Sequence, residues 1–359
     1  MKTAIVFHDD FRKYALGSDH PFTGERYKHL PEVFGHKDLS ARKSEITFMR
    51  PKPADEACIE AVHGEQYLGF IRGINETGGM ITLDTPIPPG LYDIARLFAG
   101  ANILAGRLIA ENMVRRVVVP GLGAHHAGYD FGGGFCMIND IAVMIEYLRK
   151  YYPVQKIMAI DYDAHCGDGT QDIYYDCPDV LCVDLHQDPM TLFPGKGFAY
   201  QIGVDAGQGH TINLPMPPGA SDEDFMRAFQ EVILPVAMDF APDLIVANGG
   251  LDAHVDDPLS QLRLSINGFQ QMMRSIADLS QKVCDSRLIL ILGGGYNPKV
   301  VPAAWTAMIS AMLGGPKSNV TASTAPPAFD PAIGRQVGEM VQEVKRIQRP
   351  YWPCLCAPA

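Results

Sequence analysis

The stretch Lys156–Gly169, KIMAIDYDAHCGDG, decides the fold expected for this chain. Its first half is a short apolar run, and its second half carries acidic residues, a histidine and glycines. A short, almost wholly apolar run is typical of a strand that is covered by helices on both faces. Polar side chains directly after such a strand lie at the carboxyl edge of a parallel sheet, where ligands bind. The stretch therefore predicts an α/β protein with a site at this strand end.

Similar apolar runs recur along the chain and alternate with amphipathic segments. The predicted strands are Thr3–His8, Ile46–Arg50, Arg116–Pro120, Lys156–Ile160, Val180–Leu185, Thr211–Leu214, Leu244–Ala247 and Leu288–Leu292. The predicted helices are Leu91–Met113, Asp140–Tyr151, Asp222–Asp239, Ile266–Cys284, Pro302–Met312 and a C-terminal helix Ile333–Arg349. This alternation predicts a single open, mainly parallel, eight-stranded sheet flanked by helices.

Composition sets the class of protein. The 359 residues, 47% hydrophobic and 20% charged, have the balance of a globular protein. The net charge of −11 argues against direct binding of nucleic acid or an anionic membrane. No run approaches the roughly 20 apolar residues of a membrane span, and the apolar run in Met1–Asp10 ends too early for a signal peptide. The eight cysteines form no CxxC pair, so we expect reduced thiols and a cytoplasmic protein.

One change of composition divides the chain. The segment Ser318–Pro331 is rich in Pro, Ala, Ser and Thr and predicts a linker. We therefore expect a catalytic domain over residues 1–315 and an appendage over residues 316–359, made of this linker, a helix and a tail. The appendage is expected either to pack on the catalytic domain or to contact another subunit, so a homo-oligomer stays open.

Chemically active side chains follow four of the predicted strands. They are His125 and His126 after VVVP, Asp161, Asp163, His165 and Asp168 after KIMAI, Asp252 after LIVA, and Tyr296 after LILIL. Because the carboxyl ends of parallel strands meet at one edge of a sheet, we expect these side chains to lie close together. Core packing does not require such a set, so the pattern indicates an active site.

A metal site is predicted at the second of these strand ends. Asp163 and His165 are two residues apart, so in an extended segment their side chains point to the same side, together with Asp161. A carboxylate and an imidazole suit Zn²⁺, and a third protein ligand leaves positions open for water and substrate. Asp252, at a neighbouring strand end, is the predicted third ligand.

The other polar residues predict acid–base chemistry. His125 and His126 stand in a glycine-rich turn, and Asp161 and Asp168 lie in the loop after the next predicted strand. An aspartate bonded to one ring nitrogen fixes the tautomer of a histidine and raises its basicity. Two such pairs beside a metal-bound water would supply a general base and a general acid. Tyr296 follows three glycines, which allow close approach to a ligand, and its phenol could stabilise an oxyanion.

Four segments together carry a family resemblance. HHAGYDFGGGFCMIND, DYDAHCGDG, LDAHVDDPLS and GGGYN resemble, in this order, the histone deacetylase superfamily, which includes bacterial acetoin-utilisation proteins and acetylpolyamine amidohydrolases. The resemblance covers about Met1–Gly315. It implies an arginase/deacetylase-like fold and a zinc-dependent amidohydrolase that deacylates acetylated amines, with acetyl-lysine or an acetylpolyamine as substrate.

The resemblance also implies roles for the residues at the strand ends. The family's metal ligands match Asp163, His165 and Asp252. Its general base and acid matches His126, paired with Asp168, and the histidine beside the metal-bound water matches His125, paired with Asp161. The tyrosine that polarises the substrate carbonyl matches Tyr296. The substrate-binding residues match Gly134 and Phe135 on one wall of an acyl-chain tunnel, Phe193 on the facing wall, and Leu259 and Asp84 at the rim.

The implied ions are Zn²⁺, with Fe²⁺ as the alternative occupant, and potassium as a candidate structural ion. The family often has serine where Asp184 stands, at a buried monovalent-cation site, and an extra carboxylate there would strengthen or alter that site. Cys166 stands where many eukaryotic members carry a second histidine. We assign no chemistry to this cysteine.

Two other functions stay open on the sequence. An arginase-type ureohydrolase needs two metal ions and a DAHxD pattern, but Gly167 stands in place of the second carboxylate. A catalytically silent binding protein of the same fold would usually lack a ligand or the tyrosine. Of the remaining polar residues, Asp257 is expected to cap a loop, His254 to lie at the rim or in solvent, and His20 to be structural.

Overall fold

The structure is a computed structural model that describes residues 2–315 and 327–356. Its main sheet contains β1 (Thr3–Val6), β2 (Ile46–Met49), β5 (Arg116–Val119), β6 (Ile157–Asp161), β7 (Val180–Gln187), β8 (Thr211–Met216), β9 (Leu244–Asn248) and β10 (Leu288–Ile291). The strand order is β2-β1-β5-β10-β9-β6-β7-β8, and every neighbouring pair is parallel. The predicted eight-stranded α/β sheet is confirmed, and it is parallel throughout.

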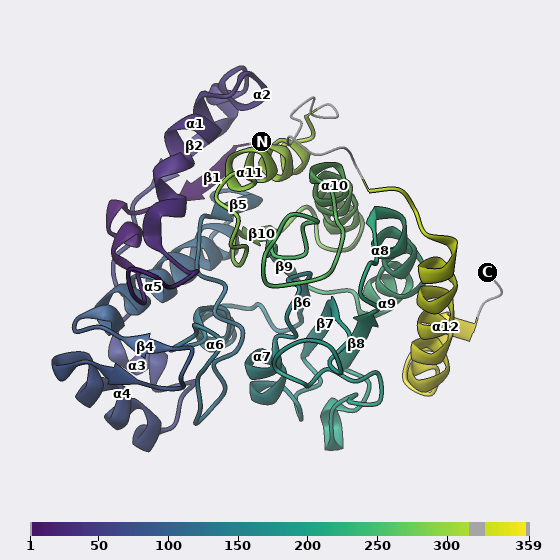
Figure 1. Ribbon diagram of the computed structural model, residues 1–359, viewed down its shortest axis with the longest axis horizontal. Helices are drawn as coiled ribbons and strands as arrows, with labels where there is room; N and C mark the ends of the chain where they lie inside the picture. The colour runs from purple at the N-terminus through teal and green to yellow at the C-terminus, as the bar shows by residue number, and fades with distance from the viewer. Residues whose placement is uncertain (1, 316–326, 357–359) are drawn as a thin grey trace.

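Helices cover both faces of this sheet (Figure 1). The longer ones are α4 (Glu65–Thr77), α5 (Leu91–Ala110), α6 (Asp140–Tyr151), α10 (Ile266–Val283), α11 (Val301–Met312) and α12 (Pro331–Gln348). The shorter ones are α1 (Leu30–Gly35), α2 (Lys37–Ser40), α3 (Glu56–Ile59), α7 (Asp168–Ile173), α8 (Asp222–Ala228) and α9 (Leu234–Phe240). The helices α5 and α6 pack together on one face, and α10 and α11 on the other (Figure 1). Apart from the edge strand β2, whose Phe48 is 55% exposed, the strands are consequently almost wholly buried, and inner ones such as β9 and β10 read as continuous apolar runs.

Some elements differ from the prediction. The helix predicted over Asp222–Asp239 is divided into α8 and α9 by a π-helical turn, Phe229–Ile233, just before Pro235. Proline has no N–H to continue the regular ladder, which accounts for the change of helical pitch. Helix α4 and the small hairpin of β3 (Gly79–Met80) and β4 (Pro86–Ile87) were not predicted. Two-residue strands carry too little alternation to be recognised in a sequence.

The C-terminal helix covers one edge of the sheet. Gln348 Nε2 donates to the Thr211 carbonyl of β8 at 2.8 Å, and Trp352 Nε1 donates to the Gly209 carbonyl at 2.7 Å. The α12 side chains Val337 and Val341 are fully buried in the main core. The helix of the predicted appendage therefore packs on the body, which was one of the two expected arrangements. Most of the predicted linker lies outside the described residues, and the boundary at residue 315 stays a prediction.

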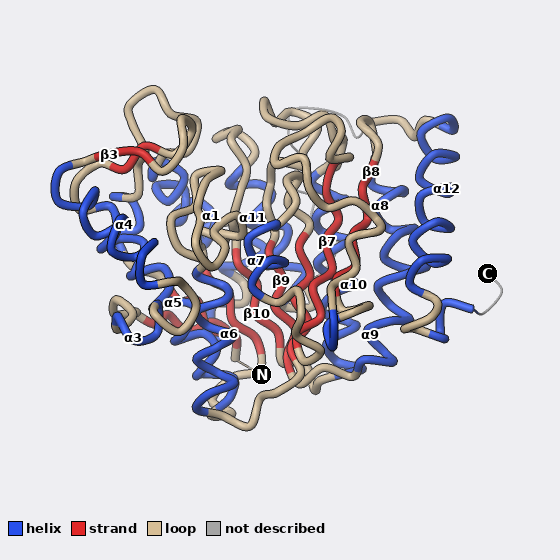
Figure 2. The backbone as a smooth tube through the Cα atoms, turned by 90° about the horizontal axis from the view of Figure 1, so that it is seen from below, coloured by secondary structure: helices blue, strands red, loops and turns tan. Residues whose placement is uncertain are grey.

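The strands β5, β10, β9 and β6 are neighbours in the sheet, so the four loops that follow them meet at its carboxyl edge (Figure 2). These are the loops in which the sequence places the candidate site. All eight cysteines are free thiols. Among the helices of residues 2–315 and 327–356, none is long and apolar enough to cross a membrane.

Candidate metal centre and active site

Three predicted ligands converge at the sheet edge. The ligand atoms of Asp163, His165 and Asp252 all lie within 4.8 Å of one another. His165 Nδ1 lies 3.2 Å from Asp163 Oδ1 and 3.0 Å from Asp252 Oδ2. Backbone hydrogen bonds orient the two carboxylates, because the His165 N–H donates to Asp163 Oδ1 at 2.9 Å and the Ala164 N–H donates to Asp252 Oδ1 at 2.8 Å. The three side chains are therefore held with their metal-ligating atoms facing one point.

The electrostatics of this group fit a divalent cation. Burial, together with the charge of Asp252, raises the pKa of Asp163. Burial opposes ionisation of Asp252 as well, but the hydrogen bond from His165 lowers its pKa. Although burial opposes it, the two carboxylates raise the pKa of His165 to about 10, so its imidazolium balances their charge. A metal ion would replace that proton with a stronger counter-charge, as expected for metal ligands.

Two glycines make room for the metal ligands. A side chain at Gly250 or Gly294 would overlap Asp163 Oδ2, and one at Gly294 would also lie 2.9 Å from Asp252 Oδ2. Both glycines belong to loops that leave neighbouring strands, β9 and β10. Gly250 in NGGLD and Gly294 in GGGYN are therefore required by close approach to the carboxylates.

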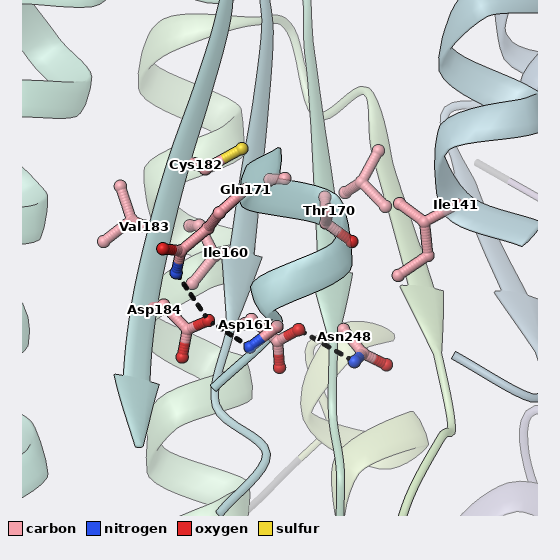
Figure 3. Close-up of a pocket in the computed structure, with 12 residues that line it drawn as sticks. Ile141, Ile160, Asp161, Thr170, Gln171, Cys182, Val183, Asp184 and Asn248 are labelled. Atoms are coloured by element: carbon pink, nitrogen blue, oxygen red, sulfur yellow. Dashed lines mark hydrogen bonds between the residues drawn. The ribbon is translucent and has the colours of Figure 1, made fainter. Parts of the chain in front are cut away.

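The first predicted histidine–aspartate pair is formed. His125 Nδ1 lies 2.8 Å from Asp161 Oδ2, and His125 Nε2 faces Asp163 Oδ1 at 3.8 Å. Asn248 Nδ2 donates to the same Asp161 oxygen at 3.0 Å, as Figure 3 shows. The Asp163 N–H donates to the other oxygen of Asp161 at 3.1 Å. Although burial opposes it, Asp161 and Asp163 raise the pKa of His125 to about 10.

The second predicted pair is also formed. His126 Nδ1 lies 2.8 Å from Asp168 Oδ1, and Lys196 Nζ lies 3.2 Å from Asp168 Oδ2. Burial, reinforced by the charge of His125, lowers the pKa of His126 to about 4 despite Asp168. Burial opposes ionisation of Asp168, but His126 and Lys196 lower its pKa. His126 is therefore a neutral imidazole at pH 7 with a carboxylate ready to stabilise its protonated form.

Further polar side chains, among them Asp184 and Gln171, lie near Asp161 (Figure 3). The carboxylate of Asp184 accepts from the Gly167 N–H at 2.7 Å and from Gln171 Nε2 at 3.2 Å, and it lies 2.8 Å from His186 Nδ1. Both oxygens of Asp184 therefore have protein partners, and its role in potassium binding stays a prediction. Cys166 is buried beside Gln171, whose Nε2 lies 3.3 Å from its sulfur. The small cavity drawn in Figure 3, about 20 Å³, has room for about one water molecule.

Aromatic rings flank the histidines. The rings of Phe193 and His126 lie edge to face with centroids 5.1 Å apart, and those of Phe135 and Tyr296 likewise at 5.5 Å. A side chain at Gly134 would press on both His126 and Phe193, at 2.8 Å from the Phe193 ring. Phe193 itself is 48% exposed. The structure thus brings the predicted tunnel residues Gly134, Phe135 and Phe193 to the histidine and tyrosine of the site.

The two predicted rim residues lie one step further out. Asp84 Oδ1 accepts from the Thr85 hydroxyl at 3.0 Å, and the same hydroxyl accepts from the Phe135 N–H at 3.0 Å, so Asp84 is linked to the tunnel wall. The Leu259 N–H donates to Asp257 Oδ1 at 2.9 Å. Since Asp257 also binds the backbone of Tyr296, Leu259 lies close to the tyrosine loop.

Two further histidines can be compared with their expected positions. His20, expected to be structural, packs its ring edge to face on Phe135 at 4.5 Å, and its Nε2 lies 3.0 Å from the Asp84 carbonyl. His254 is neither at the rim nor in solvent, because it is 1% exposed and its ring stacks on Phe269 of α10. Packing against a helix that is distant in sequence determines its position, and no local pattern reports that.

Tyr296 is held through its backbone from two sides. Its N–H donates to Asp257 Oδ2 at 2.7 Å, so Asp257 does more than cap its own loop. On the other side, the buried guanidinium of Arg26 donates to the carbonyls of Gly293, at 2.9 Å, Gly294 and Gly295. Burial, increased by the charges of Asp252 and Asp163, raises the pKa of Tyr296 well above its usual range. The phenol is therefore protonated and able to donate a hydrogen bond.

Comparisons with known proteins identify the family of this chain. The histone deacetylase domain profile matches residues 20–312. The chain is 34% identical to a probable deacetylase of Archaeoglobus fulgidus, over 99% of each chain. It is 36% identical to a histone deacetylase-like amidohydrolase of Pseudomonas aeruginosa, over 83% of this chain and 77% of that one. It is 30% identical to the acetoin utilization protein AcuC of Bacillus subtilis, over 87% and 82%.

A solved structure extends the likeness to the fold. The crystal structure of the HDA15 HD domain superimposes with a TM-score of 0.85 at 26% identity, covering 99% of this chain and 97% of that one. The profile match covers well over half of the chain, and the relatives align along most of their length. The chain belongs to the histone deacetylase family.

Proposed function

We propose that this protein is a zinc-dependent amidohydrolase that removes acyl groups from amines. One observation carries the proposal: His126, with Asp168 2.8 Å from its Nδ1, has its ring 6.0 Å from that of the ligand His165, and Tyr296 is close enough to Asp252 and Asp163 for their charges to add to burial in raising its pKa. Amide hydrolysis needs a general base, a general acid, and a donor for the negative charge that develops on the carbonyl oxygen.

Each residue of this cluster has a role in the proposed reaction. Zn²⁺ bound by Asp163, His165 and Asp252, or Fe²⁺ in its place, would lower the pKa of a bound water and polarise the carbonyl. His126 accepts a proton from the attacking water, and Asp168 stabilises the imidazolium that results. The protonated histidine then donates to the leaving amine. Tyr296 donates a hydrogen bond to the carbonyl oxygen as it gains charge.

The proposed substrate class is a linear acylated amine, either acetyl-lysine or an acetylpolyamine. The support is the pair of aromatic side chains, Phe135 and Phe193, on the two sides of the histidine–tyrosine cluster. Apolar rings suit an acyl chain with an aliphatic stem. The names of the relatives, deacetylase and deacetylase-like amidohydrolase, point to the same reaction type.

A substrate panel with metal control tests the function. We expect the purified, zinc-loaded protein to release acetate from acetyl-lysine peptide or acetylputrescine, to lose activity with a chelator, and to regain it when zinc is added back. Metal analysis should give about one ion per chain, as a three-ligand site implies. Two manganese ions per chain with release of urea from arginine would contradict the proposal, and so would a metal-loaded protein without turnover on any member of the panel.

Removing the Tyr296 hydroxyl should slow turnover without loss of metal. We expect Tyr296→Phe to lower kcat by about 100- to 1,000-fold, the usual cost of deleting one oxyanion donor. Zinc content and KM should change little, because the ring keeps its contact with Phe135 and the hydroxyl acts mainly in the transition state. Steady-state kinetics and metal analysis on the same sample check this. A variant with full kcat would remove Tyr296 from the mechanism.

Arg26 should matter for the position of Tyr296. We expect Arg26→Met to destabilise the protein by about 2 kcal/mol, since it removes the guanidinium donor from the carbonyls of Gly293 and Gly295, and to lower kcat by about 10-fold. Arg26→Lys should not restore activity, because an ammonium cannot reproduce the planar fork that reaches three carbonyls. Chemical unfolding and kinetics measure the two effects. Full activity in Arg26→Lys would show that the fork is unnecessary.

A further inference from the structure

The carboxylate behind the proposed general base has two different partners. Asp168 Oδ1 faces His126 Nδ1 at 2.8 Å, and Asp168 Oδ2 faces Lys196 Nζ at 3.2 Å. We propose that Lys196 is a positioning residue for His126, acting through Asp168. This inference rests on the proposed function, because it assigns Lys196 a part in the same reaction.

The ion pair differs from an ordinary surface pair. Exposed lysine–carboxylate pairs contribute little, because water and salt screen them. Here the Lys196 side chain is 50% exposed but that of Asp168 is only 8% exposed, so one end of the pair is shielded from solvent. The ammonium also lies over the ring of Phe131, 4.9 Å from its centroid, which limits where it can point. The contact with Phe131 thus helps to hold the Lys196 ammonium beside Asp168.

The loop that carries Lys196 does not need this ion pair to keep its place. Gln201 Oε1 accepts from the Gly197 N–H at 2.7 Å and from the Phe198 N–H at 2.8 Å. On the other side of the same residue, the Gly197 carbonyl lies 2.9 Å from Nε2 of the buried His186. Three contacts therefore fix the backbone beside Lys196 without the ion pair. The Lys196 ammonium is not needed to hold the loop and is available to bind Asp168.

The neighbouring pair, His125–Asp161, also has a second donor to its carboxylate. Asp161 faces His125 with one oxygen, and Asn248 Nδ2 donates to that oxygen from the side at 3.0 Å (Figure 3). In both pairs a second donor holds the carboxylate, so the plane of the histidine ring is defined. The two donors differ in charge, since Asn248 is neutral and Lys196 is cationic. Of these two second donors, only Lys196 forms an ion pair with its carboxylate.

The other charged groups around this pair do not replace Lys196. His125 and His165 face His126 as neighbouring imidazoles, and neither donates to Asp168 in the described contacts. Burial raises the pKa of Asp172, one turn further along α7, and the nearby Lys196 ammonium offsets only part of that effect. Loss of the lysine would therefore leave Asp168 with His126 as its one side-chain partner among the residues described.

A series of Lys196 variants tests the inference. Lys196→Met keeps the aliphatic stem and removes the charge and the donor. We expect its kcat to fall by about 10-fold, within the range for loss of a partner that orients a catalytic group, with KM and zinc content within about twofold of wild type. Lys196→Arg should restore most of kcat, and Lys196→Gln should lie between the two. Lys345→Met, which breaks the 3.4 Å pair between Lys345 of α12 and Glu231 of the π-helical turn, is the control variant and should leave kcat unchanged.

The outcomes separate the two proposals. If wild-type protein turns over acyl-amines but Lys196→Met keeps its kcat within twofold, Lys196 does not position the base while the proposed function stands. An increase in KM without loss of kcat would assign Lys196 to substrate binding and equally overturn the inference. Failure of Lys196→Arg to recover any kcat would show that a positive charge at this position does not position the base, and would overturn the inference. A zinc-loaded wild type without amidohydrolase activity would overturn both proposals.

Discussion

Replacing Asp252 with alanine is expected to produce a folded protein that no longer holds its metal. Asp252 is fully buried, and its two oxygens face His165 at 3.0 Å and the Ala164 N–H at 2.8 Å. Without it two protein ligands remain, which is one fewer than a catalytic zinc site uses. We expect metal affinity to fall by at least about 100-fold, the upper end of what losing an outer-shell partner costs, and activity to fall below detection.

Competitive chelator titration measures the affinity, and elemental analysis after dialysis measures the content. Asp278→Ala, at an exposed position on α10, is the matched control and should keep both values. His165 loses one of the two carboxylates that balance its charge in Asp252→Ala, which could destabilise the protein. Circular dichroism therefore checks that the variant is folded. One tightly bound ion per chain in Asp252→Ala would show that the metal lies elsewhere.

The fold could be predicted because burial leaves a direct trace in the sequence. Strands such as β9 and β10 are covered on both faces, so their sequences LIVAN and LILI are apolar at nearly every position. The site followed from the fold, since Asp163, His165, Asp252 and Tyr296 stand just beyond strand ends. Their grouping in the structure follows from the strand order, which places β5, β10, β9 and β6 side by side.

The supporting residues could not be found in the same way. Arg26 comes from a short N-terminal 3₁₀ helix and Lys196 from the loop after β7, and neither has a spacing that relates it to its partner. Only tertiary packing brings Arg26 to the glycine loop and Lys196 to Asp168. Asn248 is the exception. It is the last residue of β9, so the rule that selected Asp252 would also have selected it.

Replacing His126 with alanine is expected to lower kcat by about 100- to 10,000-fold, the range for loss of a general acid or base. Zinc content should stay the same, because His126 is not one of the three ligands: its Nδ1 faces Asp168, and its ring only packs edge to face against those of Phe193 and His165. His29→Ala, at a partly exposed histidine paired with Glu32, is the matched control and should keep kcat. Kinetics with metal analysis on each sample measure both quantities.

The neighbouring histidine makes this prediction sharper. His125 Nε2 lies 3.8 Å from Asp163 Oδ1, so His125→Ala removes a charge that faces a metal ligand as well as a group of the active site. We expect His125→Ala to weaken metal binding together with turnover, whereas His126→Ala weakens turnover alone. If the two variants lost kcat and zinc in parallel, the general base could not be assigned to His126 on this evidence, and His125, backed by Asp161 and Asn248, would become the stronger choice.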